Sequence, residues 1–283
     1  MRVAAAPISW GVCEVPGWGH QLTPERVLTE MRQLGITATE FGPYGYLPTE
    51  PGARSELLAR HGLAAVGGFV PVVLHQADRD PLDKVRAALD GFGDATMLVL
   101  AAATGQPGYD QRPVLDQAGW QVLSANLDRV ADYAAERGVL ATLHPHVGTM
   151  IETADEVRRV LDGARAPLCL DTGHLLLGGT DPAALARAAP ERIAHVHLKD
   201  VQIGIAEQIR SGELRYTDAV RQGVFCPLGQ GDVDIAGIVS ALAKAGYRGW
   251  YVLEQDTVLD AEPAGDTGPA HDVRASLSYL ERL

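Results

Sequence analysis

Acidic and imidazole side chains recur at the ends of short apolar runs in the second half of the sequence. One run ends in His144-Pro145-His146, with Glu152 soon after, and the next runs end in Asp171, His197 and Glu254. Side chains of these types bind metal ions and transfer protons. A charged group at the end of a buried strand needs a partner that offsets its loss of water. The recurrence therefore indicates one common chemical centre.

Four of these side chains form the predicted metal site: Glu152, Asp171, His197 and Glu254. Three carboxylates and one imidazole suit a hard to borderline divalent cation that keeps open positions for substrate oxygens. We expect one ion, with Mn²⁺ as the first choice and Co²⁺, Mg²⁺ and Zn²⁺ as the other options. The predicted proton-transfer residues lie among and beside these ligands: His146, Glu152, His174 and Lys199.

Each of these residues also has a purely structural interpretation. A buried histidine can be a hydrogen-bonded core residue. Glu152 can cap the next helix, and His174 can hydrogen-bond within the turn that follows Asp171. Against this, six of the nine histidines lie at or just after predicted strand ends: His75, His144, His146, His174, His195 and His197. Acids and histidines at the same end of consecutive strands favour a metal or catalytic centre.

Eight apolar runs alternate with eight amphipathic segments, and these predict the elements that must position the side chains. The predicted strands are 3–10, 38–41, 64–74, 97–102, 140–146, 168–171, 193–199 and 250–254. The predicted helices are 24–34, 54–61, 81–92, 118–137, 154–161, 182–189, 235–245 and 270–283. Thr23-Pro24 and Asp181-Pro182 are typical helix starts, and Gly35 and Gly62 are typical of helix ends.

This alternation predicts an α/β fold, a single (β/α)8 TIM barrel over residues 1–283. A doubly wound sheet is the alternative, but it usually has fewer strands, and no glycine-rich nucleotide-binding turn follows the first strand. In a barrel the carboxyl ends of all strands meet at one mouth, so the candidate residues would converge there. A long excursion at about 201–234, between the seventh strand and its helix, is predicted to be a lid.

Composition excludes several other classes of protein. The chain has 36 acidic and 24 basic residues, a net charge of -12, which opposes nucleic acid and anionic membrane surfaces as partners. Three widely spaced cysteines indicate neither a disulfide framework nor a thiolate metal site. With no signal peptide or membrane-spanning run in the sequence, we expect a cytoplasmic enzyme.

The sequence resembles the xylose isomerase-like barrel superfamily of sugar isomerases, epimerases and dehydratases, and within it the inosose (2-keto-myo-inositol) dehydratases. The resemblance is carried by Ala6-Pro7-Ile8-Ser9-Trp10-Gly11, Thr39-Glu40-Phe41-Gly42, His144-Pro145-His146-Val147-Gly148-Thr149, Asp171-Thr172-Gly173-His174, His195-Val196-His197-Leu198-Lys199-Asp200 and Val252-Leu253-Glu254-Gln255-Asp256. It implies one divalent metal, with Asp171, His197 and Glu254 at the usual ligand positions. Many relatives have a glutamate where this chain has His144, so the fourth ligand is either His144 or Glu152, and we place Glu152 there.

The resemblance also implies a pocket for a small polyol or ketose. Trp10 and Glu40 match positions that line the sugar pocket, and Phe225 lies in a segment that resembles a pocket cover. His75, His144 and His195 complete the predicted substrate-binding set. Dimers and tetramers are common among relatives, so the resemblance is compatible with a homo-oligomer.

The first functional hypothesis is a metal-dependent lyase that dehydrates a keto-inositol such as 2-keto-myo-inositol through a metal-stabilised enolate. His146 or Glu152 would remove the proton, and His174, Lys199 or metal-bound water would protonate the leaving hydroxyl. The alternative is an isomerase or epimerase of a ketose or keto-inositol, with Glu152 and Glu254 as paired bases. A remote alternative is an endonuclease IV-like DNA repair enzyme, which the net charge opposes. A sugar-binding barrel without metal is the non-catalytic alternative.

Overall fold

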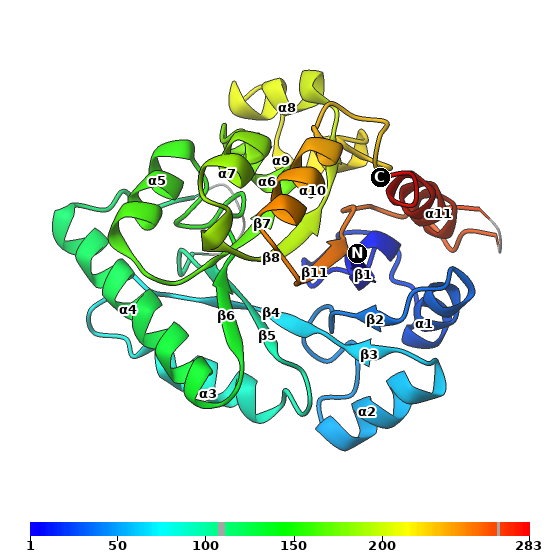
Figure 1. The fold of residues 1–283 in the computed structure, drawn as a ribbon, viewed down its shortest axis with the longest axis horizontal. Coiled ribbons are helices and arrows are strands. Elements are labelled where there is room, and N and C mark those ends of the chain that lie inside the picture. Colours follow the sequence, from blue (N-terminus) through cyan, green and yellow to red (C-terminus); the bar gives the residue numbers. More distant parts are fainter. Residues whose placement is uncertain (107–110, 265–266) are drawn as a thin grey trace.

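The computed structural model describes residues 1–106, 111–264 and 267–283, and its main sheet is a parallel barrel (Figure 1). The sheet follows the order β3-β2-β1-β11-β8-β7-β6-β5-β4. Its strands are β1 Arg2–Ala5, β2 Ala38–Thr39, β3 Ala64–Ala65, β4 Gly67–Val72, β5 Met97–Ala102, β6 Leu140–Leu143, β7 Leu168–Asp171, β8 Ile193–Leu198 and β11 Trp250–Leu253. All neighbouring pairs within it run parallel.

The two ends of this sheet order are halves of one strand, interrupted at Val66. The amide of Val66 donates to the Thr39 carbonyl at 2.9 Å on one side, and its carbonyl accepts from Met97 at 3.1 Å on the other. The sheet is therefore closed around eight strand positions, which confirms the predicted TIM barrel. Near-continuous burial of β5 and β7 is the pattern expected of parallel strands covered by helices.

Eight helices lie close to the eight predicted segments and surround the barrel (Figure 1). They are α1 Pro24–Gln33, α2 Pro51–Arg60, α3 Pro81–Asp90, α4 Gln117–Glu136, α5 Ala154–Gly163, α7 Pro182–Ala188, α10 Ile235–Lys244 and α11 Pro269–Leu280. Their starts follow the local chemistry of the sequence. Thr23 accepts a hydrogen bond from the Arg26 amide, and Thr153 forms a reciprocal capping box with Glu156.

The first predicted strand is too long. β1 ends at Ala5, and residues Pro7–Trp10 form a short 3-10 helix instead. Proline has no amide hydrogen to donate to a strand ladder, and its fixed φ suits the first position of a helical turn. The turn moves Trp10 into the core beside α1, where its indole nitrogen donates to Glu30 at 2.8 Å.

The 201–234 excursion is folded rather than an open loop. It contains α8 Ile203–Arg210 and α9 Tyr216–Arg221, and an antiparallel pair joins β9 Asp200–Val201 to β10 Phe225–Cys226. Trp18, Val147 and Leu177 of the barrel side pack with its apolar residues in a second core. A further short helix, α6 Thr172–Leu177, lies between β7 and α7 and contacts α8.

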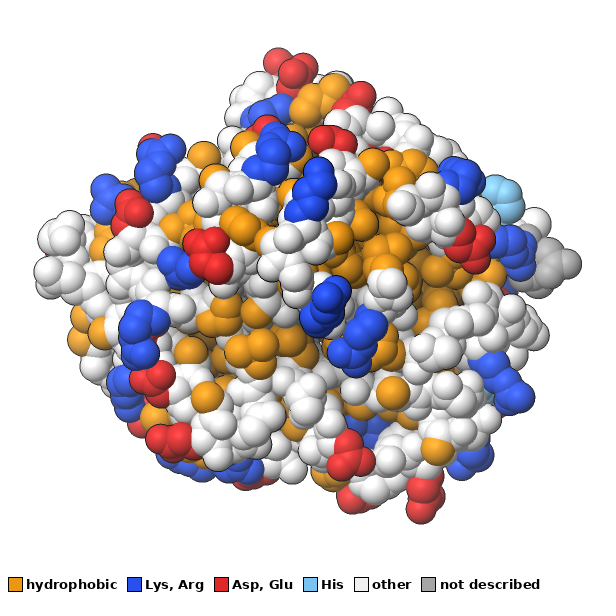
Figure 2. All heavy atoms as spheres, viewed as in Figure 1, with side chains coloured by type: hydrophobic (Ala, Val, Ile, Leu, Met, Phe, Trp, Pro, Cys, Tyr) orange, Lys and Arg blue, Asp and Glu red, His pale blue; other side chains and the backbone are white. Residues whose placement is uncertain are grey.

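The surface follows the same division between buried and charged residues. Figure 2 shows charged side chains mostly toward the rim of the face in view, with Lys or Arg side chains also near its middle among exposed apolar atoms. Among the described residues, no helix combines the length and apolar character needed to cross a membrane. Cys13, Cys169 and Cys226 all carry free thiols.

Candidate active site

The carboxyl ends of the barrel strands surround a cavity of about 620 Å³. Apolar side chains line part of it: Ile8, Phe69, Val70, Pro71, Ala101 and Ala103. Titratable side chains line another part: Glu40, His144, His146, Lys199, Glu254 and Asp256. A concave site with a few converging polar groups in an apolar wall is typical of a small-molecule pocket.

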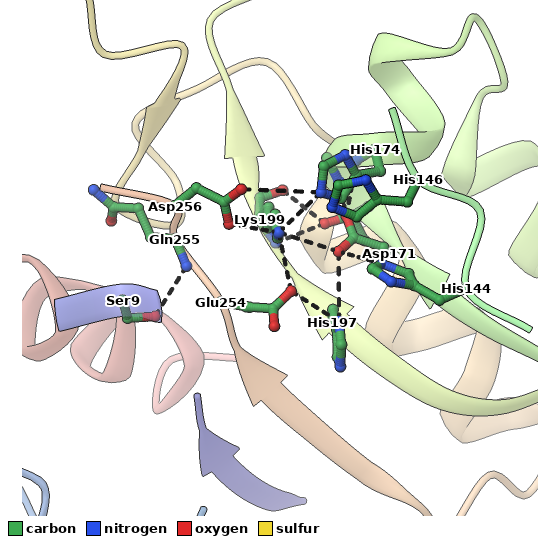
Figure 3. A network of polar contacts seen from close by, with 12 residues as sticks. Ser9, His144, His146, Asp171, His174, His197, Lys199, Glu254, Gln255 and Asp256 are labelled. Carbon is green, nitrogen blue, oxygen red and sulfur yellow. Dashed lines mark hydrogen bonds and ion pairs between the residues drawn. The ribbon is translucent and has the colours of Figure 1, made fainter. Parts of the chain in front are cut away.

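Beside this cavity, His144, Asp171, His197 and Glu254 come together as a four-residue cluster (Figure 3). One possible ligand atom from each lies within 4.8 Å of the others. His144 Nε2 is 3.0 Å from Asp171 Oδ2, and His197 Nδ1 is 2.9 Å from Glu254 Oε2. The cluster draws on the ends of four consecutive barrel positions, β6, β7, β8 and β11, because parallel strands bring these ends to one side.

Glu40 orients the cluster through its contacts with two histidines of β8. Its Oε1 atom accepts from His195 Nε2 at 2.7 Å and from His197 Nε2 at 3.0 Å. Alternate residues of β8 face the same side, which places both rings against one carboxylate. When the His197 ring is neutral, as a metal ligand must be, its proton is on Nε2 and the lone pair of Nδ1 faces Glu254 and Asp171. A carboxylate behind a histidine in this way is typical of metal-binding histidines.

These contacts test whether the site fits a metal ion. His197 Nδ1 lies 3.5 Å from Asp171 and still closer to Glu254, yet neither contact has the geometry of a hydrogen bond. Among the described residues, His144 Nδ1 also has no hydrogen-bond partner. A lone pair that faces two carboxylates is repulsive unless the ring is protonated or a cation lies between them. Two imidazoles and two carboxylates therefore fit a divalent cation.

The electrostatics of the site are dominated by burial and by these neighbours. Burial alone would raise the pKa of Glu254, but the charges of His197 and Lys199 lower it to about 2. The pKa of Asp171 is likewise held well below its usual value by Lys199 and the surrounding histidines, despite burial. Burial would lower the pKa of His197, but Cys169, Glu254 and Glu40 raise it. The cluster thus contains ionised carboxylates that are stabilised by neighbouring positive charge.

The fourth member of the cluster differs from the sequence-based choice. His144 belongs to it, and Glu152 belongs to none of the potential metal-binding groups among the described residues. Glu152 instead accepts from the Gly148 amide at 2.7 Å and lies 3.4 Å from Arg112. Burial raises the pKa of Glu152. It lies eight positions after His144 in the sequence, and the intervening turn directs it to Arg112.

Lys199 is the buried cation of the site, with an exposed fraction of 2%. Its ammonium lies 2.6 Å from Asp256, 2.9 Å from Glu254 and 3.5 Å from Asp171 (Figure 3). Burial alone would lower the lysine pKa, but the three carboxylates raise it well above its usual value. Lys199 therefore stays charged at neutral pH and presents an ammonium to the cavity that it lines.

Two of the four proton-transfer candidates line the cavity, and two do not. His146 and Lys199 line the cavity, whereas Glu152 and His174 are not among its lining residues. The His146 and His174 rings contact each other with centroids 3.7 Å apart and planes inclined by 32°. Burial and the charges of neighbouring groups lower the pKa of His146 to about 3, so its ring is neutral. His146 Nδ1 donates to the Val147 carbonyl at 2.7 Å, which makes Nε2 the basic nitrogen.

Of the six predicted substrate-binding residues, two line the cavity. Glu40 and His144 line the cavity. The other four are not among its lining residues: Trp10, His75, His195 and Phe225. Trp10 faces the core, and His195 lies beneath Glu40. Phe225 contacts the site indirectly, with its ring 5.4 Å from Lys199 Nζ.

Two residues of the site were not among the sequence-based candidates. Asp256 lies two positions after Glu254, and that spacing could have suggested a side chain on the same face. Tyr216 lies on α9 and donates from its hydroxyl to Asp256 Oδ2 at 2.5 Å. No motif in the sequence distinguished this tyrosine, because the contact joins residues 40 positions apart through the fold of the excursion.

Comparisons with known proteins agree with this architecture. Residues 28–283 match the xylose isomerase-like TIM barrel family. The chain is 35% identical over 267 residues to the rhizopine catabolism protein MocC of Rhizobium meliloti, covering 90% of this chain and 82% of that protein. It is 31% identical over 272 residues to an inosose dehydratase of Geobacillus thermodenitrificans, covering 90% of each. A solved L-ribulose 3-epimerase shares the fold, with a TM-score of 0.68 and 18% identity over 99% of this chain and 93% of that one.

Proposed function

The chain belongs to the xylose isomerase-like TIM barrel family, and we propose that it is a metal-dependent dehydratase of a keto-inositol such as 2-keto-myo-inositol. One observation carries the proposal: a buried cluster suited to a divalent cation adjoins a cavity that also presents the Lys199 ammonium. The relatives named inosose dehydratase support the substrate class.

His144, Asp171, His197 and Glu254 would hold the ion, and Glu40 would orient His197. We propose Mn²⁺ as the resident metal. When bound, such an ion polarises a ketone and a neighbouring hydroxyl and so acidifies the hydrogen on the carbon between them. The four ligand side chains are fixed by their strands before substrate arrives, which reduces the cost of organising the site.

The residues of the cavity can then move the two protons that dehydration requires. Nε2 of His146 accepts the proton from the carbon next to the ketone, and the electrons of that C–H bond form the new double bond. The C–O bond of the β-hydroxyl then breaks, and its electron pair leaves with the oxygen. Lys199 donates a proton to the departing oxygen, which leaves as water. The adjacent His174 ring keeps His146 against the cavity wall.

Paired-base epimerisation receives less support from the arrangement. That mechanism was assigned to Glu152 and Glu254, but Glu152 is held at Gly148 and Arg112 and is not among the cavity-lining residues. A DNA repair activity is opposed by the net charge of -12. The three potential metal-binding groups among the described residues all include His197. They therefore describe a single metal site, and the DNA repair enzymes of this barrel type would need three metal ions.

The test is turnover of 2-keto-myo-inositol by metal-loaded protein. Dehydration gives a conjugated dione with new ultraviolet absorbance, and chelation of the metal should abolish it. The Asp171→Asn variant should lose the activity, because it lacks one ionised ligand. Deuterium uptake from solvent into recovered substrate, without loss of water, would instead support an epimerase or isomerase. Absence of both reactions with every divalent metal would refute the proposed function.

A further inference from the structure

We propose that Tyr216 and Asp256 are positioning residues that hold the Lys199 ammonium at the cavity wall, so the 201–234 excursion is part of the catalytic machinery. The excursion was expected to be a lid over the pocket. Its tyrosine instead contacts the site through a buried carboxylate. The inference rests on the proposed function to the extent that Lys199 acts on the substrate.

The three carboxylates around Lys199 have different roles. Asp171 and Glu254 belong to the four-residue cluster and would face a bound cation. Asp256 lies outside that cluster and makes the shortest contact to the lysine, 2.6 Å from Oδ1 to Nζ. Once a cation attracts the other two carboxylates, Asp256 is the anionic partner that stays with Lys199. The orientation of the ammonium then depends on the orientation of Asp256.

Tyr216 fixes that orientation. Asp256 is buried, with one carboxylate oxygen on Lys199 and the other accepting from the Tyr216 hydroxyl at 2.5 Å. Holding both oxygens fixes the plane of the carboxylate. His174 Nε2 lies 3.9 Å from Oδ2, which is beyond hydrogen-bond distance. Without the tyrosine hydroxyl the carboxylate could rotate about its χ2 torsion.

The stem of Lys199 is fitted closely between its neighbours. A Cβ atom added at Gly173 would lie 2.7 Å from Lys199 Cβ and 2.8 Å from the Phe225 ring. The Phe225 ring in turn packs against Tyr216, with centroids 6.4 Å apart. The excursion thus contributes two aromatic residues to this arrangement. Phe225 limits the path of the lysine stem, and Tyr216 fixes the partner of its ammonium.

The excursion is built to hold this position. Asp200 accepts hydrogen bonds from the backbone amides of Val201, Gly229, Gly231 and Val233, at 2.8–3.0 Å. Tyr216 and its neighbours belong to an apolar core that includes Val147 and Trp18 from the barrel side. A segment that is anchored on both sides holds the Tyr216 hydroxyl in a fixed orientation toward Asp256. It is less suited to opening and closing over the cavity.

The experiment compares Tyr216→Phe and Asp256→Asn in the full-length, metal-loaded protein. Tyr247→Phe is the matched control, since its partly buried hydroxyl donates to the Trp250 carbonyl at the amino end of β11. We expect Tyr216→Phe to lower kcat about tenfold with KM within about twofold, as for one lost orienting hydrogen bond. The double variant should be no slower than Asp256→Asn alone, because the tyrosine acts through the aspartate.

Crystal structures of the wild type and of Tyr216→Phe give a readout independent of turnover. We expect the Asp256 carboxylate to rotate and the 2.6 Å contact with Lys199 to lengthen in the variant. An unchanged contact, an additive double variant, or an equal loss of kcat in Tyr247→Phe would overturn the inference. If the wild type turns over no keto-inositol, the proposed function fails, and the crystal structures still decide whether Tyr216 positions Lys199.

Discussion

Replacing His144 by alanine and Glu152 by glutamine separates the two assignments of the fourth metal ligand. In the structure, one possible ligand atom of His144 lies within 4.8 Å of one each from Asp171, His197 and Glu254, while Glu152 is held at Gly148 and Arg112. Four protein ligands hold a structural Zn²⁺ ion with roughly 10–16 kcal/mol, and the weaker-binding Mn²⁺ ion falls at or below the lower end of this range. One ligand of four then accounts for about 3 kcal/mol, or roughly a hundredfold in Kd.

We therefore expect His144→Ala to weaken Mn²⁺ binding by about a hundredfold and Glu152→Gln to leave it within about threefold. Glutamine retains an oxygen that can accept from the Gly148 amide, so the turn around residue 152 should persist. The assay is metal titration in competition with a fluorescent chelator, with unfolding of the metal-free variants as a check on folding. A hundredfold loss in Glu152→Gln with normal affinity in His144→Ala would refute the structural assignment.

Three further predictions concern the surroundings of the site. Glu40→Gln should weaken metal binding about 10- to 100-fold in the same titration without removing a ligand of the four-residue cluster; Glu30→Gln is the control, and equal affinities would contradict the prediction. Asp200→Ala should lower the free energy of unfolding in urea by about 3 kcal/mol, because four backbone amides lose their acceptor. Asp181→Ala, which removes an ordinary helix cap, should cost only about 1 kcal/mol, and a loss no larger in Asp200→Ala would count against this reasoning. Burial raises the pKa of Cys13 to about 12, so its alkylation at pH 8 should be at least about a hundredfold slower in the native protein than in urea; equal rates would contradict that pKa.

The fold was predictable because it depends on patterns that are local in sequence. Alternating apolar runs and capped amphipathic segments located all eight barrel positions, including 64–74, which the structure divides at Val66. Residues at strand ends were predictable for the same reason, since a parallel barrel brings every carboxyl end to one mouth. Asp171, His197 and Glu254 met there as expected.

The residues that were misplaced depend on turns and on contacts distant in sequence. Trp10 faces the core because Pro7 ends β1 and begins a 3-10 turn, which changes the direction of the side chains that follow. Glu152 was chosen over His144 from the residue types of relatives, but the turn after β6 decides which side chain reaches Asp171. Tyr216 could not be found, because its partner is 40 residues away and only the folded excursion joins them.

The charges of the site explain why these residues occur together. The site contains four buried or nearly buried carboxylates, Glu40, Asp171, Glu254 and Asp256, and the last three contact Lys199. Asp256 forms a compact pair with Lys199, and Glu40 accepts from two imidazoles. Asp171 and Glu254 then remain as two negative charges beside Nδ1 of His197, and burial makes uncompensated charge costly. A divalent cation would neutralise both carboxylates, whereas a monovalent cation would leave one negative charge uncompensated. The Lys199–Asp256 pair and the four-residue cluster thus belong to one arrangement of charges. A carboxylate that neutralises the lysine is not available to neutralise a bound cation.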